Sequence, residues 1–251
     1  MWRKTAVWWM TALSAVALTA CTGPAEPEST VATTETSGAP DTDPVTGMTP
    51  CGDIGSAATP PDCVLRARDG TGLVFEVRHA ANGSSSLTTI IVRDSDGEQV
   101  QTITEKGWRA AAGARLRDLD ADGRDELIIP LFLATANASY AIYHAGGGSL
   151  EYRRAGQLGG IGIDTSDSGY TVASARAGYA AWDVQFWTFV QDRLHPVVTA
   201  QVRPIEGSDG KVAGTTCAVV DSGGLDDLGL SASAATAQFC AEPTVVRVMR
   251  N

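Results

Sequence analysis

The sequence predicts a mainly β fold: an antiparallel sandwich, barrel or propeller-like domain with a short C-terminal helix. From residue 64 onward, short runs rich in β-branched residues recur at regular spacing. Turn sequences such as DGTG, ANGSSS and DSDG separate these runs. No segment before residue 225 keeps the apolar period of about 3.6 residues that an amphipathic helix shows. Many short strands joined by such turns are typical of sandwiches, barrels and propellers.

The first twenty residues, MWRKTAVWWMTALSAVALTA, predict a secretory signal peptide. Arg3 and Lys4 form a short, positively charged N-terminal region, and an apolar stretch follows from Ala6 to Leu18. Small residues close the segment, which completes the layout of a secretory signal. The apolar stretch is too short, and too interrupted by Thr and Ser, to predict a permanent transmembrane span.

The segment Leu18-Thr19-Ala20-Cys21 resembles the lipobox of bacterial lipoproteins. The resemblance implies cleavage before Cys21 and acylation of its sulfur, with palmitate-type chains that hold the protein at the membrane. We therefore expect a lipid-anchored protein at the extracytoplasmic face of the cell membrane. The alternative is an ordinary signal peptide followed by a chance cysteine.

Residues 21–50 predict a lipidated cysteine followed by a tether. Positions 22–50 hold five prolines, eight threonines and five acidic residues, without Lys, Arg or an aromatic residue. Such a segment buries too little apolar surface to offset the entropy of ordering, so we expect it to be disordered. Residues 51–251 then form the extracytoplasmic β domain, long enough for one substantial domain or two small ones.

The charge balance restricts the class of partner. Cleavage after residue 20 removes two basic residues and no acid, which leaves 17 basic against 29 acidic residues and a net charge of −12. This balance argues against nucleic acid and against a polybasic hold on anionic lipid. It is compatible with a basic protein partner or with divalent cations.

Four cysteines besides the lipidated one predict two disulfides, because an even number in an exported protein favours a disulfide framework. We favour Cys51–Cys63 and Cys217–Cys240, since both pairs close short local loops, while the two other pairings stay open. A zinc site is the rival interpretation. The chain has no CxxC pair and its histidines are remote from the cysteines.

The elements follow in chain order. The predicted strands are Val64–Arg68, Leu73–His79, Leu87–Asp94, Gln99–Thr104, Leu127–Leu133, Tyr140–His144, Tyr170–Ala173, Trp182–Val190, Pro196–Arg203 and Val212–Val220. A short helix is predicted within Asp226–Ala241, ending before Pro243. The strand Trp182–Val190 is apolar on both faces, which predicts a central, buried strand. The alternative is that one aromatic face is a binding surface.

The most specific motif is DLDADGRDE at residues 118–126. Asp118, Asp120 and Asp122 can direct oxygens to one point, and Gly123 permits a sharp turn. The carbonyl of Arg124 and the carboxylate of Glu126 can complete a shell of hard oxygen ligands, which suits Ca²⁺.

The motif has two other interpretations. An EF-hand needs Glu at the twelfth loop position, where Ile129 stands, and the flanks resemble strands. A metal-free turn would balance the carboxylates with backbone N–H groups and with Arg115, Arg117 or Arg124.

The segment ARLRDLDADGRDELIIPL resembles FG-GAP/VCBS repeats, in which such a loop precedes a β-strand. It is also similar to the periplasmic inhibitors of invertebrate-type lysozyme and their relatives, over roughly residues 70–203. The segment DSDGEQV at 94–100 is a degenerate copy of the motif. The first resemblance implies a β-propeller built from several such repeats, of which this sequence contains one full copy. The second implies inhibition through a Ser-Gly-containing loop, of which Ser168-Gly169-Tyr170 matches a fragment.

Enzyme motifs are weak. DSGG at 221–224 is similar to the nucleophile segment of trypsin-like proteases, but a triad also needs a histidine base. His79, His144 and His195 lie in contexts that do not match one, and no GxSxG, HExxH or P-loop occurs. We therefore expect a non-catalytic envelope binding protein for an envelope protein or a glycan, with lysozyme inhibition as one form of that activity. The alternative is an envelope hydrolase using acidic residues.

Overall fold

The structure is a computed structural model that describes residues 42–51, 62–108 and 113–250. Its strands are β1 (Cys63–Arg66), β2 (Val74–Asn82), β3 (Ser85–Arg93), β4 (Gln99–Trp108), β5 (Arg115–Arg117), β6 (Glu126–Leu133), β7 (Ala138–His144), β8 (Arg153–Gly160), β9 (Gly162–Thr165), β10 (Thr171–Gly178), β11 (Ala181–Val190), β12 (Arg193–Glu206) and β13 (Val212–Asp221). Its helices are α1 (Leu225–Leu228), α2 (Ala232–Phe239) and α3 (Pro243–Met249). The fold is mainly β, as the sequence predicts.

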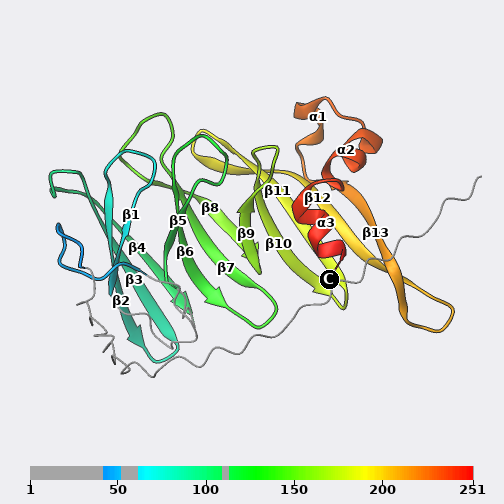
Figure 1. Cartoon of the computed structure of the whole chain (residues 1–251), viewed down its shortest axis with the longest axis horizontal. Coiled ribbons are helices and arrows are strands. Elements are labelled where there is room, and N and C mark those ends of the chain that lie inside the picture. The colour runs from blue at the N-terminus through cyan, green and yellow to red at the C-terminus, as the bar shows by residue number, and fades with distance from the viewer. Residues whose placement is uncertain (1–41, 52–61, 109–112, 251) are drawn as a thin grey trace, which may run out of the picture. The chain divides into compact units, whose positions relative to one another are not determined.

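The described strands form two sheets, neither closed into a barrel (Figure 1). The first has the order β1-β2-β3-β4-β6-β7-β8, with β5 paired to β6, and the second has the order β13-β12-β11-β10-β9. A single parallel bridge, Trp108 to Phe132, joins β4 to β6. The first sheet therefore divides into two antiparallel meanders, β1–β4 and β5–β8.

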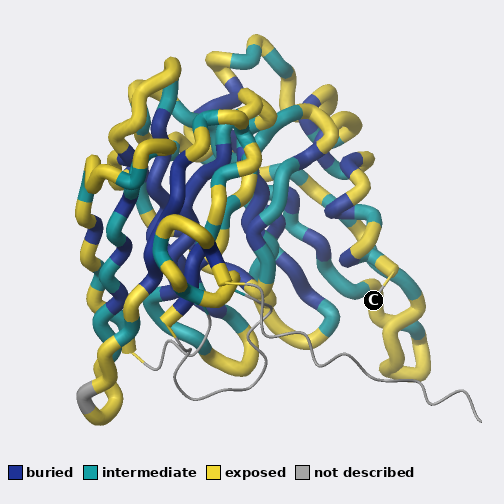
Figure 2. The backbone as a smooth tube through the Cα atoms, turned by 60° about the vertical axis from the view of Figure 1, so that its left-hand side comes forward, coloured by how far each residue is buried: buried dark blue, intermediate teal, exposed yellow. Residues whose placement is uncertain are grey.

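The two meanders and the second sheet pack as successive layers. Strand β6 shows this directly, because Leu127 and Ile129 enter the core shared with β1–β4 whereas Ile128 enters the core shared with the second sheet. All three side chains are fully buried, and Figure 2 shows the dark-blue runs of buried backbone within the strands. A strand between two layers must be apolar on both faces, which accounts for the continuous run LIIP.

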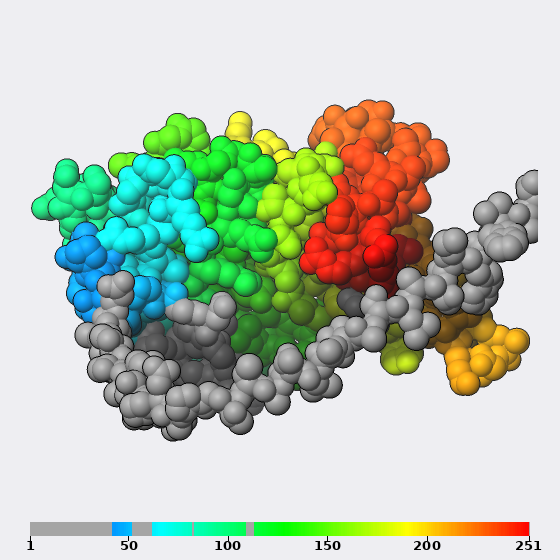
Figure 3. Space-filling view, viewed as in Figure 1, coloured from blue at the N-terminus to red at the C-terminus, as the bar shows by residue number. Residues whose placement is uncertain are grey.

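A third core lies between the second sheet and the helices. Its side chains include Phe186 of β11, Phe239 of α2 and Val245 of α3. In the space-filling view the orange-to-red helices stand against this sheet (Figure 3). None of the described helices is long and apolar enough to cross a membrane.

The predicted central position of the Trp182–Val190 strand is confirmed. Strand β11 lies between β10 and β12. Its Trp182, Val184 and Phe186 side chains face the helices, whereas Trp187 and Phe189 pack against the core between the sheets.

Three strands and the helical region differ from the sequence prediction. Strands β5, β8 and β9 were not predicted, because RLR is short and RRAGQLGG and GIDT have no run of β-branched residues. Gly160 explains part of this composition, since a Cβ there would lie 2.5 Å from the carbonyl oxygen of Ser174. The predicted helix is divided into α1 and α2, and α3 was missed. Pro243 is the first residue of α3, where a missing N–H costs nothing, and does not only end α2.

The folded part also begins earlier than residue 51. The Asp43 side chain is buried, accepts N–H bonds from Val45 and Thr46, and forms an ion pair with Arg66. Residues 42–50 therefore belong to the fold and not to the tether. The predicted signal peptide, Cys21 and residues 22–41 lie outside the described residues.

Both favoured disulfides are confirmed: Cys51–Cys63 joins the N-terminal segment to β1, and Cys217–Cys240 joins β13 to the end of α2. Replacing Cys217 and Cys240 together by serine should lower the free energy of unfolding by about 3 kcal/mol, because the open chain regains loop entropy. Urea unfolding of the oxidised proteins measures this. The double variant of Cys51 and Cys63 should lose a similar amount, and losses below about 0.5 kcal/mol would contradict the account.

Candidate metal site

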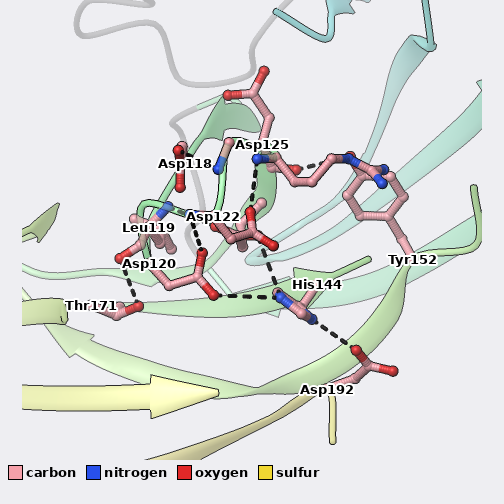
Figure 4. Close-up of polar contacts among 12 residues, drawn as sticks. Asp118, Leu119, Asp120, Asp122, Asp125, His144, Tyr152, Thr171 and Asp192 are labelled. Carbon is pink, nitrogen blue, oxygen red and sulfur yellow. Dashed lines mark hydrogen bonds and ion pairs between the residues drawn. The ribbon is translucent and has the colours of Figure 1, made fainter. Parts of the chain in front are cut away.

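The aspartate loop lies between β5 and β6 and is held by the layers on either side. On one side, the Arg124 Nε atom is 2.8 Å from Asp69 Oδ2, in the turn between β1 and β2. On the other, the Thr165 hydroxyl donates to the carbonyl of Asp118 at 2.6 Å. The Thr171 hydroxyl donates to the carbonyl of Leu119 at 3.0 Å, as Figure 4 shows. These external contacts fix the loop backbone independently of any ion.

The loop itself turns sharply at two residues. Gly123 has φ +87°, as the sequence predicts, and Ala121 has φ +61°, which a residue with a Cβ rarely adopts. Backbone N–H groups bind one oxygen of each loop carboxylate. Gly123 donates to Asp118 Oδ2 (3.0 Å), Asp122 to Asp120 Oδ1 (3.3 Å) and Arg124 to Asp122 Oδ1 (2.7 Å).

The structure brings Asp118, Asp120 and Asp122 together, with one oxygen from each lying within 4.8 Å of the others. Burial raises the pKa of Asp122, and the neighbouring carboxylates of Asp120 and Asp118 raise it further. The convergence of negative charge thus has an electrostatic cost, which a divalent cation would relieve.

The arginines that could balance this charge have other partners. Among the described residues, Arg117 pairs with Asp164 and Arg124 with Asp69, while the Arg115 guanidinium lies over the ring of Tyr140. Of the contacts that a metal-free turn requires, the backbone N–H bonds are therefore present, whereas the contacts from the three arginines to the loop carboxylates are not found among the described residues.

One of the predicted ligand side chains, that of Glu126, takes a different place. The Arg124 guanidinium, which is not the predicted ligand, binds Asp69 and the carbonyl of Ser149 and so fixes the loop from outside. Glu126 does not join Asp118 and Asp122, but forms a second group with Asp120 and His144. Its Oε2 accepts the N–H of Leu119 at 2.6 Å, and its Oε1 is 4.0 Å from His144 Nε2.

His144 is the site residue that sequence reasoning missed. Its Nδ1 is 2.9 Å from Asp192 Oδ1, its Nε2 is 3.6 Å from Asp120 Oδ2, and its ring stacks on Phe189 (Figure 4). A signal existed: with Tyr140 and Ile142, His144 continues the face of β7 that is buried against the second sheet. A histidine that extends an apolar face into the core needs polar partners.

The electrostatics of this group follow from burial and from its charges. Burial lowers the pKa of His144, but Asp120, Asp192 and Glu126 outweigh this and raise it to about 9. Burial raises the pKa of Glu126 to about 8. Without an ion, the imidazole is thus a cation among three carboxyl groups.

No protein-family model, curated protein or solved structure matches this chain.

Proposed function

We propose that this chain is a non-catalytic, lipid-anchored binding protein of the bacterial cell envelope whose aspartate loop binds Ca²⁺. The observation that carries the calcium proposal is the convergence of Asp118, Asp120 and Asp122. Hard divalent cations prefer several carboxylate and carbonyl oxygens around one point.

The hydrogen bonds of the loop leave ligand atoms available. Each of the three carboxylates uses one oxygen to accept a backbone N–H, which leaves its second oxygen outside these loop hydrogen bonds; the second oxygen of Asp120 also lies 3.6 Å from His144 Nε2. Asp118 Oδ1 is buried and has no hydrogen-bond partner among the described residues. A buried acceptor without a partner is costly, and coordination would satisfy it.

The burial of Glu126 and the lining of a surface hollow favour a binding function over hydrolysis of a glycan. Glu126, the carboxyl group with the most strongly raised pKa, is fully buried and has no access to a glycan. A surface hollow of about 720 Å³ is lined by residues 42–44, 50–51, 64–68 and 114–116, without an aromatic side chain on which a sugar could stack. Its carboxylate, that of Asp43, is paired with Arg66.

The lipid anchor and the partner rest on the sequence. The lipobox-like segment ending in Cys21 supports attachment at the extracytoplasmic face, and the acidic mature chain supports a partner with basic groups. We do not extend the proposal to lysozyme inhibition through Ser168-Gly169-Tyr170. The Ser168 hydroxyl donates to Glu242 and the Tyr170 ring packs on Phe239, so this turn is tied to the helices.

Calcium should raise the melting temperature of the full-length chain. Extracellular calcium modules have Kd values of about 10⁻⁴–10⁻³ M, so 10 mM calcium contributes about 1.4–2.7 kcal/mol through binding to the native state alone. For a chain of this size that corresponds to a rise of about 3–10 °C over EDTA. Thermal melts followed by circular dichroism, in EDTA and in calcium, measure it.

The variant Asp122→Asn should abolish the rise, because it removes one charged ligand while its Oδ1 can still accept the N–H of Arg124. Asp94→Asn is the matched control: Asp94 accepts the N–H groups of Asp96 and Glu98 in the DSDG turn, outside the loop. The quantity compared between the variants is the rise of the melting temperature from EDTA to calcium. The melting temperature in EDTA alone is not compared, because D122N also removes repulsion between the loop carboxylates. An unchanged wild-type melting temperature would make the loop a hydrogen-bonded turn.

A further inference from the structure

Beside the aspartate loop, three ligand-type side chains from separate elements point to one place. Asp120 belongs to the loop, Glu126 begins β6 and His144 ends β7. One ligand atom of each lies within 4.8 Å of the other two. Figure 4 shows the His144 ring between Asp120 on one side and Asp192 on the other.

We propose that Asp120, Glu126 and His144 form a second metal site, next to the calcium loop and sharing Asp120 with it, for a transition metal of the zinc class. The site goes beyond the proposed calcium function and does not depend on it.

The distances fit such an ion. Nitrogen and oxygen ligands lie about 2.0–2.2 Å from Zn²⁺, so two ligand atoms at a tetrahedral angle are about 3.4 Å apart. His144 Nε2 is 3.6 Å from Asp120 Oδ2 and 4.0 Å from Glu126 Oε1. The first pair needs almost no movement, and Glu126 needs an approach of roughly half an ångström.

Two buried atoms at this place have no hydrogen-bond partner in the part of the chain that the structure describes, and this observation is independent of the clustering. The side chain of Glu126 is 0% exposed and that of His144 is 7% exposed. Among the described residues, Glu126 Oε1 and His144 Nε2 are both buried without a hydrogen bond. Distances of 3.6 and 4.0 Å are too long for a hydrogen bond from His144 Nε2 to either carboxyl group, whereas one ion between them would satisfy both buried atoms.

The other atoms of these side chains are already held. Asp192 Oδ1 binds His144 Nδ1 at 2.9 Å, which leaves Nε2 as the ligand atom, as in carboxylate–histidine–metal triads. Asp192 lies in the β11–β12 turn, where Gln191 and Asp192 both have positive φ. The N–H of Leu119 holds Glu126 Oε2. The site is therefore oriented by groups that do not themselves face the ion.

The ligand set selects the class of metal. Imidazole nitrogen suits zinc and its neighbours, whereas Ca²⁺ and Mg²⁺ take oxygen ligands. Asp120 belongs to both groups, so the two sites are separated experimentally through the residues that are unique to each: His144 here and Asp122 in the loop.

The test is zinc binding to the full-length chain, purified in mild detergent, freed of metal with a chelator and titrated with Zn²⁺ against a chromophoric zinc indicator. Wild type should bind one zinc ion with a Kd in the micromolar range or tighter, and Co²⁺ should give visible absorption bands. His144→Gln and Glu126→Gln should each weaken binding at least tenfold. Asp192→Asn should weaken it about 10–100-fold, as removal of such an orienting partner does.

Asp122→Asn and His195→Gln are the controls and should stay within threefold of wild type, since His195 is an exposed histidine. If His144→Gln does not fold, the near-isosteric Glu126→Gln decides, because its amide oxygen can still accept the Leu119 N–H. Absence of zinc binding at 100 µM, binding unchanged in both Glu126→Gln and Asp192→Asn, or binding lost in His195→Gln would each overturn the proposal. The calcium-dependent rise of the melting temperature is unaffected by these failures, so the two sites are tested separately.

Discussion

Replacing Cys21 by serine is expected to move the protein from the membrane pellet to the soluble fraction. A serine hydroxyl cannot form the thioether to the lipid, and each buried CH₂ of an acyl chain contributes about 0.8 kcal/mol of membrane affinity. The predicted mature chain has a net charge of −12, so electrostatic attraction to anionic lipid cannot replace the lipid anchor. Fractionation of cells followed by a high-salt wash and immunoblotting measures the change.

The conservative variant Thr22→Ser, one residue beyond the predicted cleavage point, should remain in the pellet. Mass spectrometry of the N-terminal peptide should find the acyl mass in this control and in wild type. A Cys21→Ser protein that stays in the pellet after the wash would refute the lipoprotein interpretation.

The strands that the sequence predicts well are those whose own residues determine their environment. Strand β6 reads as a continuous apolar run because both of its faces are covered, and β11 carries aromatic residues on both faces for the same reason. Strands β8 and β9 carry no such signal. Glycine is required at position 160, at the end of β8, because the Ser174 carbonyl approaches it closely. No local sequence pattern encodes this contact.

The candidate site divides in the same way. The convergence of Asp118, Asp120 and Asp122 follows from a local turn, so the motif predicted it. The contact of Glu126 with His144 depends on the register of β6 against β7, in which Leu127 pairs with Tyr143. Asp192 arrives from another sheet, 48 residues further along the chain from His144. Groups joined by layer packing cannot be read from one sequence.

Phe186→Ala should strongly destabilise the fold, and it tests the two interpretations of β11. The side chain is fully buried, with its ring centroid 4.9 Å from that of Phe239 and 6.4 Å from that of Tyr170. Truncation leaves a cavity between the second sheet and α2, at a cost of about 3–5 kcal/mol. The melting temperature should fall by roughly 6–20 °C, at about 2–4 °C per kcal/mol.

Tyr179→Ala is the control, because Tyr179 is 86% exposed in the turn between β10 and β11 and should change stability by no more than about 0.5 kcal/mol. If β11 instead presented this aromatic face to a ligand, Phe186→Ala would leave the melting temperature nearly unchanged and would reduce retention of an envelope partner. A loss of stability in Phe186→Ala with Tyr179→Ala unaffected means that the aromatic residues facing the helices join the C-terminal helices to the sheet. The search for the partner then belongs on the exposed turns and on the aspartate loop.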